Sequence, residues 1–156
     1  MHGIIGRATP FLAVVLLAGC ATNHASSDDP MAQKVTPLIN ATTRKATEEE
    51  AFAELASLGN DAVPYLVGHL GDTRKLPIKH LSLINTAPDA FEGIRHYGPE
   101  VVHDGLSAVL NQITGKSFEF VYNGSNAAER ESDRKQWQNW CVGAYPEKSS
   151  VCRGGG

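Results

Sequence analysis

The N-terminal segment constrains this chain most, because it separates a short leader from the part that folds. Arg7 supplies the one full positive charge of the leader, residues 11–18 form an uninterrupted apolar run, and small residues then lead to Cys20. This layout is typical of a secretory signal peptide, and the run is far shorter than the ~20 residues of a membrane-spanning helix. We predict that residues 1–19 are removed. The alternative, a buried core helix at 11–18, leaves the position of Cys20 unexplained.

The end of this leader, Leu17-Ala18-Gly19-Cys20, resembles the lipobox of bacterial lipoproteins. The resemblance implies cleavage before Cys20 and attachment of diacylglycerol to its thiol, so that the membrane is one binding partner. Each buried CH2 group contributes ~0.8 kcal/mol, and two or more lipid chains anchor a protein stably. Ala21 stands where an Asp would favour the inner membrane. The resemblance therefore also implies the outer membrane of a Gram-negative host, facing the periplasm.

Length and charge limit what the rest of the chain can be. Removal of residues 1–19 from the 156-residue chain leaves 137 residues, enough for one domain with a real core. Residues 20–34, lipidated Cys20 included, are predicted to form a flexible tether, and residues 35–156 a single helical domain. Lys and Arg number 14 against 17 Asp and Glu; without Arg7 they number 13, which gives a net charge of −4. Such a chain lacks the basic face that nucleic-acid binding needs.

Three cysteines are an odd number, which would leave one spare thiol in an exported protein. Lipidation of Cys20 accounts for one, and Cys141 and Cys152 then form a pair suited to an oxidising periplasm. A disulfide between them would stabilise the C-terminal region by roughly 2–3 kcal/mol. Two free thiols are the alternative. The pair lacks the Cys-x-x-Cys spacing, which makes redox catalysis and zinc binding weak interpretations.

Apolar periodicity predicts helices over residues 47–58, 61–70, 99–114 and 127–141. The first begins with Thr47-Glu48-Glu49-Glu50, which has the form of a capping box, and Gly59 suits its end. Asp61 is the expected cap of the second helix, and Asn126 that of the last. The third helix, with Pro99 in its first turn, has an apolar face over four turns and should be the central core helix.

The first two helices carry a resemblance of their own. Residues 53–72 contain the pattern Leu-Gly-x-x-Ala-Val-Pro-x-Leu, starting at residue 58, and resemble one unit of the HEAT-like helical repeats. Such repeats usually bind other proteins, and relatives include bilin lyases and a hydroxylase that binds iron through His-Glu pairs. No His-Glu dipeptide occurs in this sequence, so the metal-dependent branch is not supported. The expected fold is all-α or mostly α, with a HEAT-like hairpin, two further helices and, as an option, one small two-stranded β-ribbon.

Residues 73–98 interrupt the helical pattern with a long irregular excursion. Within it, residues 81–85 alternate as a short strand does, residues 86–89 indicate a turn, and residues 90–97 indicate one or two helical turns. A second alternating stretch at 117–122 is the candidate partner of 81–85 in a ribbon. Long ordered loops are disproportionately functional, so we expect a site in this excursion.

The sequence shows no pattern of a catalytic or metal site. Its histidines lack the i, i+4 spacing and the His-Glu-x-x-His pattern of paired metal ligands. Gly-x-Ser-x-Gly and Gly-x-x-x-x-Gly-Lys do not occur either. We therefore expect no catalytic residue, no metal and no cofactor. A metal-dependent enzyme that uses the region of His96 and His103 is the alternative.

The residues selected for partner binding lie at or just beyond the end of the irregular excursion: Arg95, His96, Tyr97 and His103. Arg and Tyr are over-represented at protein interfaces, and ordinary solvated loop residues are the simpler alternative. Trp137 and Trp140 fit a core-facing helix better than an exposed stripe. The sequence thus favours a non-catalytic envelope lipoprotein that binds a protein of unknown identity, for example as an inhibitor or immunity protein. A structural envelope role is the alternative within the same class.

Overall fold

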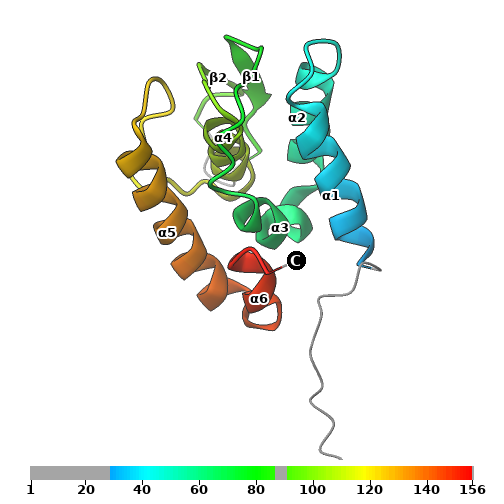
Figure 1. Ribbon diagram of the computed structural model, residues 1–156, viewed down its shortest axis with the longest axis vertical. Helices are drawn as coiled ribbons and strands as arrows, with labels where there is room; N and C mark the ends of the chain where they lie inside the picture. Colours follow the sequence, from blue (N-terminus) through cyan, green and yellow to red (C-terminus); the bar gives the residue numbers. More distant parts are fainter. Residues whose placement is uncertain (1–28, 87–90, 156) are drawn as a thin grey trace, which may run out of the picture.

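The computed structural model describes residues 29–86 and 91–155. Cys20, the leader and most of the tether therefore lie outside the described residues, as does most of the turn expected at 86–89. In these two ranges the chain is mostly helical with one two-stranded antiparallel sheet, which confirms the coarser prediction of a mostly α fold with one small β-ribbon. No helix among the described residues is long and apolar enough to cross a membrane. The elements in chain order (Figure 1) are α1 (Pro30–Ala41), α2 (Glu48–Ser57), the 3-10 turn η1 (Gly59–Ala62), α3 (Val63–Gly68), β1 (Leu81–Ile84), β2 (Ile94–Tyr97), α4 (Val102–Thr114), α5 (Ala127–Ala144), the 3-10 turn η2 (Pro146–Lys148) and α6 (Ser149–Cys152).

Helix α4 is the central element of the core, as its long apolar face predicted. Every residue from Val102 to Ile113 is buried, and α2, α3 and β1 pack around the helix. Gly105 permits the closest of these contacts, because a Cβ there would lie 2.4 Å from Cζ of Phe52 on α2. The helix ends at Gly115, whose φ of 70° is left-handed.

The beginning of α4 differs from the prediction. Pro99 was expected in the first turn, whereas the helix starts three residues further on. The buried carboxylate of Asp104 sets this start, since it accepts hydrogen bonds from the amides of Glu100 (3.0 Å) and Val101 (3.2 Å). Arg130 of α5 donates to the same carboxylate from Nε at 2.8 Å and Nη2 at 3.0 Å. One buried acid therefore both caps α4 and ties it to α5.

Helix α1 forms although Pro37 lies in its interior. Asp29 caps the helix by accepting hydrogen bonds from the amides two and three residues further on, at 2.9 Å and 3.4 Å. Val35 and Ile39 are fully buried, whereas Pro37 lies on the exposed face. Packing of the apolar face thus outweighs the ~3 kcal/mol that an interior proline costs.

Helices α2 and α3 lie where helices were predicted, but their caps differ. The Thr47 hydroxyl donates to the carbonyl of Ala41 at 2.9 Å and makes no cap bond to α2, so the predicted capping box does not form. Asp61 lies inside η1 and does not cap α3. Gly59, with a φ of 66°, follows the end of α2 as predicted. The two helices have different main neighbours: α2 packs on α1 and α4, and α3 packs on α6 and α5.

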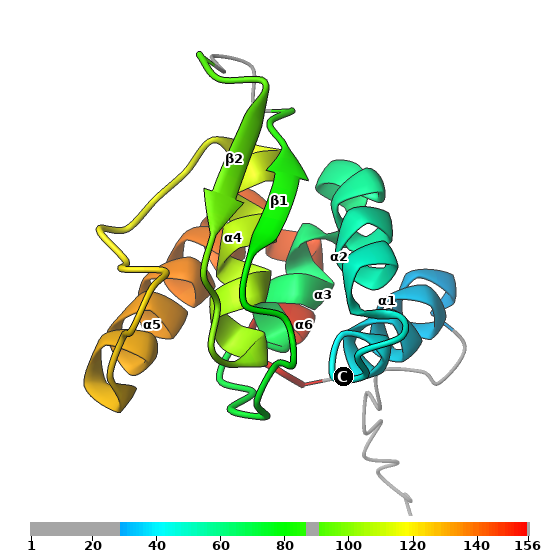
Figure 2. The same ribbon diagram turned by 90° about the horizontal axis from the view of Figure 1, so that it is seen from above.

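Strands β1 and β2 form an antiparallel hairpin that packs on α4 (Figure 2), with Leu81 opposite Tyr97 and Ile84 opposite Ile94. The prediction of helical turns is therefore wrong for residues 94–97, and so is the pairing of 81–85 with 117–122. Leu81, Leu83 and Tyr97 are buried on one face of the hairpin, which the two-residue period of strands allows. Within residues 117–122, which do not pair with β1, Glu119 has a φ of 60°, and regular strands do not contain such a value.

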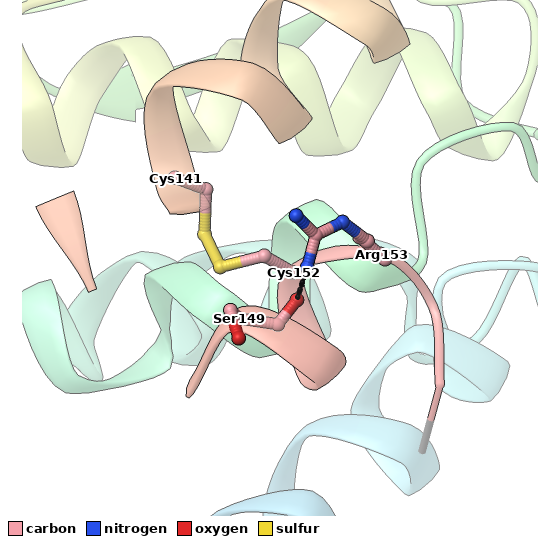
Figure 3. Close-up of a disulfide and its surroundings, with 4 residues drawn as sticks. All are labelled: Cys141, Ser149, Cys152 and Arg153. Carbon is pink, nitrogen blue, oxygen red and sulfur yellow. Dashed lines mark hydrogen bonds between the residues drawn. A yellow bond between two sulfur atoms is a disulfide. The ribbon is translucent and has the colours of Figure 1, made fainter. Parts of the chain in front are cut away.

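Helix α5 carries the C-terminal part of the core. Its N-cap follows the prediction: the Asn126 side chain accepts from the amide of Glu129, whose carboxylate accepts from the amide of Asn126. Trp137 and Cys141 are fully buried, which places Trp137 in the core as expected. A disulfide joins Cys141 to Cys152 on α6 (Figure 3), with the Cα atoms 5.9 Å apart. This bridge holds α6 against the end of α5 and beneath α3.

Candidate functional site

A cleft of about 380 Å³ lies along the outer side of β2. One wall is β2 itself, and the other is the irregular segment between α4 and α5. Three of the four residues selected from the sequence line it: Arg95, His96 and Tyr97. The remaining lining residues are Asn111, Ser117, Phe120, Val121, Tyr122 and Asn123. The structure therefore brings the predicted residues together around one concave surface.

Strand geometry gives Arg95 and His96 opposite directions from β2. Arg95 lies on the core side of the hairpin, where its Nη1 donates to Oδ1 of Asn111 on α4 at 3.0 Å. Its side chain is still 42% exposed, and Nε lies 3.8 Å from the exposed carboxylate of Glu92. His96 lies on the solvent side, where its Nδ1 is 2.8 Å from the hydroxyl of Ser82 on β1. The cleft thus has a cation anchored at its base and an imidazole at its rim.

Tyr97 supports the cleft from below. Its side chain is buried, its hydroxyl donates to Oδ1 of Asn111 at 3.1 Å, and it accepts a hydrogen bond from Gln112. Burial raises the pKa of this tyrosine. Its ring meets that of Tyr122 edge-on at 5.1 Å, and burial raises the pKa of Tyr122 to about 12. Tyr97 therefore positions the floor of the cleft and offers a partner little surface.

Asn111 and Gln112 belong to this site although the sequence interpretation did not select them. Asn111 accepts from both Arg95 and Tyr97 through Oδ1, and its Nδ2 donates to the carbonyl of Lys116 at 2.8 Å. The signal that could have revealed them is a pair of adjacent amide side chains within the helix that was predicted to be the centre of the core. Buried amides need partners, and here they hold β2 and the segment after α4 to the core.

His103 lies away from the cleft, inside the core. The amide of Gly71 donates to its Nδ1 at 3.0 Å, so its proton is on Nε2, which lies 3.1 Å from Oδ2 of Asp133. Ser107 donates to the same oxygen at 2.9 Å and accepts from Trp137 at 3.2 Å. All of these side chains are buried. Serine, histidine and aspartate meet here, but the hydroxyl donates to the carboxylate and not to the imidazole, so the hydrogen-bond order of a Ser-His-Asp triad is not formed.

A second, acidic cleft of about 220 Å³ lies on the other side of residues 118–121, against α5. Glu119, Glu129 and Asp133 line it. Oδ1 of Asp133 is buried and has no hydrogen-bond partner in the described part of the chain. Among residues 29–86 and 91–155, no three His, Cys, Asp or Glu side chains are grouped closely enough to hold a metal ion. Glu129 is engaged in capping α5, which leaves this cleft without a complete ligand set.

A third cleft, of about 430 Å³, lies where the described chain begins. Asp29 accepts hydrogen bonds there from the hydroxyl of Tyr65 at 2.5 Å and from Nζ of Lys148 at 2.9 Å. These bonds lower the pKa of Asp29 far below its usual range, and the bonds to Tyr65 and Asp29 raise the pKa of Lys148. The cluster ties the start of α1 to the C-terminal region. Asp29 lies within the predicted tether 20–34, of which residues 30–34 are helical and belong to α1.

The tip of the hairpin exposes large apolar side chains beside the first cleft. Ile84 is 70% exposed, Ile94 is 56% exposed, and the two are cross-strand neighbours on the same face. Phe91, three residues before Ile94, is 96% exposed. Trp137, by contrast, is fully buried and Trp140 is half-buried against it. The exposed apolar surface of the described chain is therefore concentrated on the hairpin and at Val121, across the cleft.

Comparison with known proteins adds no relative, because no protein family, no curated protein and no solved structure matches this chain. The functional interpretation therefore depends on the chain's own residues. Two features carry it: the lipobox-like sequence at Cys20, and the β1–β2 hairpin with the cleft along its outer side.

Proposed function

We propose that this chain is a lipoprotein of the bacterial envelope, anchored through lipid on Cys20 in the outer membrane and facing the periplasm. Eight residues separate Cys20 from Asp29, so the start of the folded domain lies at most about 30 Å from the anchor along the chain. The start of α1 and the hairpin lie toward opposite ends of the molecule (Figure 1). An anchored domain would therefore present its hairpin away from its own membrane.

The proposed activity is non-catalytic binding of another protein through the hairpin. The observation that carries this proposal is the exposure of Ile84, Phe91 and Ile94 on one projecting element. Full burial of such a side chain by a partner is worth about 1.5–3 kcal/mol, and contiguous exposed apolar surface is typical of interaction sites. Arg95, anchored beside these residues, adds a charged group of the kind that interfaces favour.

An inhibitor or immunity protein that neutralises a toxic hydrolase of the cell wall or of lipids is the sharper form of this proposal. It is supported by the envelope anchor, the small domain and the binding surface, which also support an assembly or structural role. The proposal includes a HEAT-like origin for residues 53–72, supported by the two helices that form there around Gly59.

Site-specific photo-crosslinking in intact cells tests the proposal. A photoreactive amino acid replaces Ile94 on the hairpin or, as the matched control, Lys135, an exposed residue of α5 that borders none of the three clefts. A discrete protein adduct from position 94, absent from position 135, is expected. No discrete adduct from position 94, or the same adducts from both positions, would exclude the hairpin as a binding surface.

A further inference from the structure

The outer edge of β2 has backbone groups that the hairpin does not use. The amide of Asn85 donates to the carbonyl of Gly93 at 3.1 Å, which makes the adjacent Ile84–Ile94 pair one without mutual hydrogen bonds. Bonded and non-bonded pairs alternate along antiparallel strands, so His96 has the same orientation as Ile94. The amide and carbonyl groups of Ile94 and His96 therefore point outward from the hairpin. No hydrogen bond in the described part of the chain engages them.

This edge faces the cleft. The backbone amide of Gly98, two residues after His96, also points outward, and it donates to Oδ1 of Asn123 at 2.7 Å. Asn123 thus closes one end of the cleft, while the chain before it lies apart from β2 (Figure 2). Residues 95–97 on one side and Ser117 and residues 120–123 on the other line the cleft of about 380 Å³. An unpaired strand edge beside an open cleft is the arrangement that accepts an added strand.

The charge of the cleft indicates what the added strand carries. Among the described residues that line it, Arg95 is the one with a full charge, and none is a carboxylate. A residue opposite Arg95 on a new strand would place its side chain on the same face, at the close spacing of a non-hydrogen-bonded pair. Its neighbours would point to the other face, where Ile94 is exposed. The fitting pattern is an acidic residue flanked by an apolar residue.

We propose that the outer edge of β2 binds an extended segment of a protein partner as an added strand, with a carboxylate of that segment opposite Arg95. This inference rests on the proposed function, because it names how the hairpin holds the protein that it binds. The partner's backbone pairs with Ile94 and His96, and its acidic side chain meets the guanidinium. The exposed pair between Arg95 and Glu92, at 3.8 Å, is weak enough for the incoming carboxylate to displace.

Selection of phage-displayed random decapeptides on the full-length protein in detergent tests this inference. Enrichment of peptides that contain Asp or Glu beside an apolar residue is expected. In the free protein the amides of Ile94 and His96 should exchange rapidly with solvent, and a selected peptide should slow their exchange at least about tenfold. Arg95→Gln should weaken peptide binding about fivefold, and Lys135→Gln should leave it unchanged.

N-methylation of the selected peptide separates strand addition from side-chain binding. Methylation of the acidic residue's own nitrogen should be tolerated, because that nitrogen points away from β2. Methylation of either neighbouring nitrogen should weaken binding about tenfold or more, because each loses a hydrogen bond to the edge. No enriched peptide, protection that spares Ile94 and His96, or a methylation effect without this alternation would overturn the inference.

The two proposals fail in different ways. Crosslinks from position 94 in cells, combined with no alternation in the methylated peptides, would retain the binding function and refute strand addition. If the effect of N-methylation alternates along the peptide but position 94 gives no crosslink in cells, the strand-accepting edge is retained and the function proposed for it is refuted.

Discussion

Gly105→Ala tests the packing of the core that supports the hairpin. Alanine is favoured over glycine in a helix by up to ~1 kcal/mol, so α4 alone would gain stability. The new Cβ, however, would lie 2.4 Å from Cζ and 2.6 Å from Cε1 of Phe52, which is fully buried and has little room to move. Overpacking of this kind typically costs ~1–3 kcal/mol, and the clash should outweigh the gain in helix propensity. We expect a net loss of about 1–2 kcal/mol.

The assay is urea unfolding at constant oxidation state, followed by the fluorescence of the buried Trp137. Gly143→Ala is the matched control, because Gly143 also lies in a helix but has no atom within 4 Å of the added Cβ. The control should be unchanged or more stable by up to ~1 kcal/mol. If Gly105→Ala is as stable as the wild type, the close packing of Gly105 on α4 against Phe52 on α2 is refuted.

The remaining predictions concern the disulfide, the N-terminal cluster and the anchor. Cys141→Ala with Cys152→Ala should lower the free energy of unfolding by ~2–3 kcal/mol in urea titrations, and thiol labelling of the unreduced, unfolded protein should find neither thiol free. Because the pKa of Asp29 is lowered in the folded state, its contribution to stability is present above its unfolded pKa and is lost on acidification. Asp29→Asn should therefore lose less stability than the wild type between pH 5 and about pH 2 in parallel thermal melts, and equal losses would refute this cluster. Cys20→Ser should move the protein from the membrane to the soluble fraction on centrifugation, and continued sedimentation with membranes would refute the lipid anchor.

Helices α2, α3, α4 and α5 were predictable from their sequence patterns, whereas α1 was not predicted. The apolar spacing of α4 located the central helix, and Asn126 marked the start of α5 correctly. The capping box predicted at Thr47 was wrong, because the Thr47 hydroxyl donates to the carbonyl of Ala41 instead of capping α2. A local motif offers a hydrogen bond, but the tertiary surroundings decide which partner receives it.

The hairpin was not predictable from periodicity alone. Residues 94–97 do not alternate between apolar and polar, since Arg95 lies on the core side of the sheet. It can lie there because Asn111 of α4 accepts its hydrogen bond, a long-range pairing that no local pattern reveals. The same contact explains why the cleft was only partly foreseen. Arg95 and His96 could be selected from their segment, whereas Asn111 required the register of β2 against α4.

His103 was grouped with these residues because it lies close to them in the sequence. In α4 its side chain is buried, where the amide of Gly71 and Asp133 of α5 are its partners. A histidine among apolar helix positions is satisfied by whichever polar groups the packing brings, and sequence distance does not identify them. The proposed binding surface is therefore the hairpin and its outer edge, without His103.

The measurement that tests the central claim most directly is crosslinking in intact cells followed by purification of the anchored protein. The wild type is compared with Ile84→Ser/Ile94→Ser, which removes exposed apolar surface without touching the core, and with Cys20→Ser. The account predicts one stoichiometric protein partner with the wild type, its loss with the double variant, and its reduction when the anchor is removed. Equal recovery of the partner by the double variant, or recovery of abundant envelope proteins only, would contradict it.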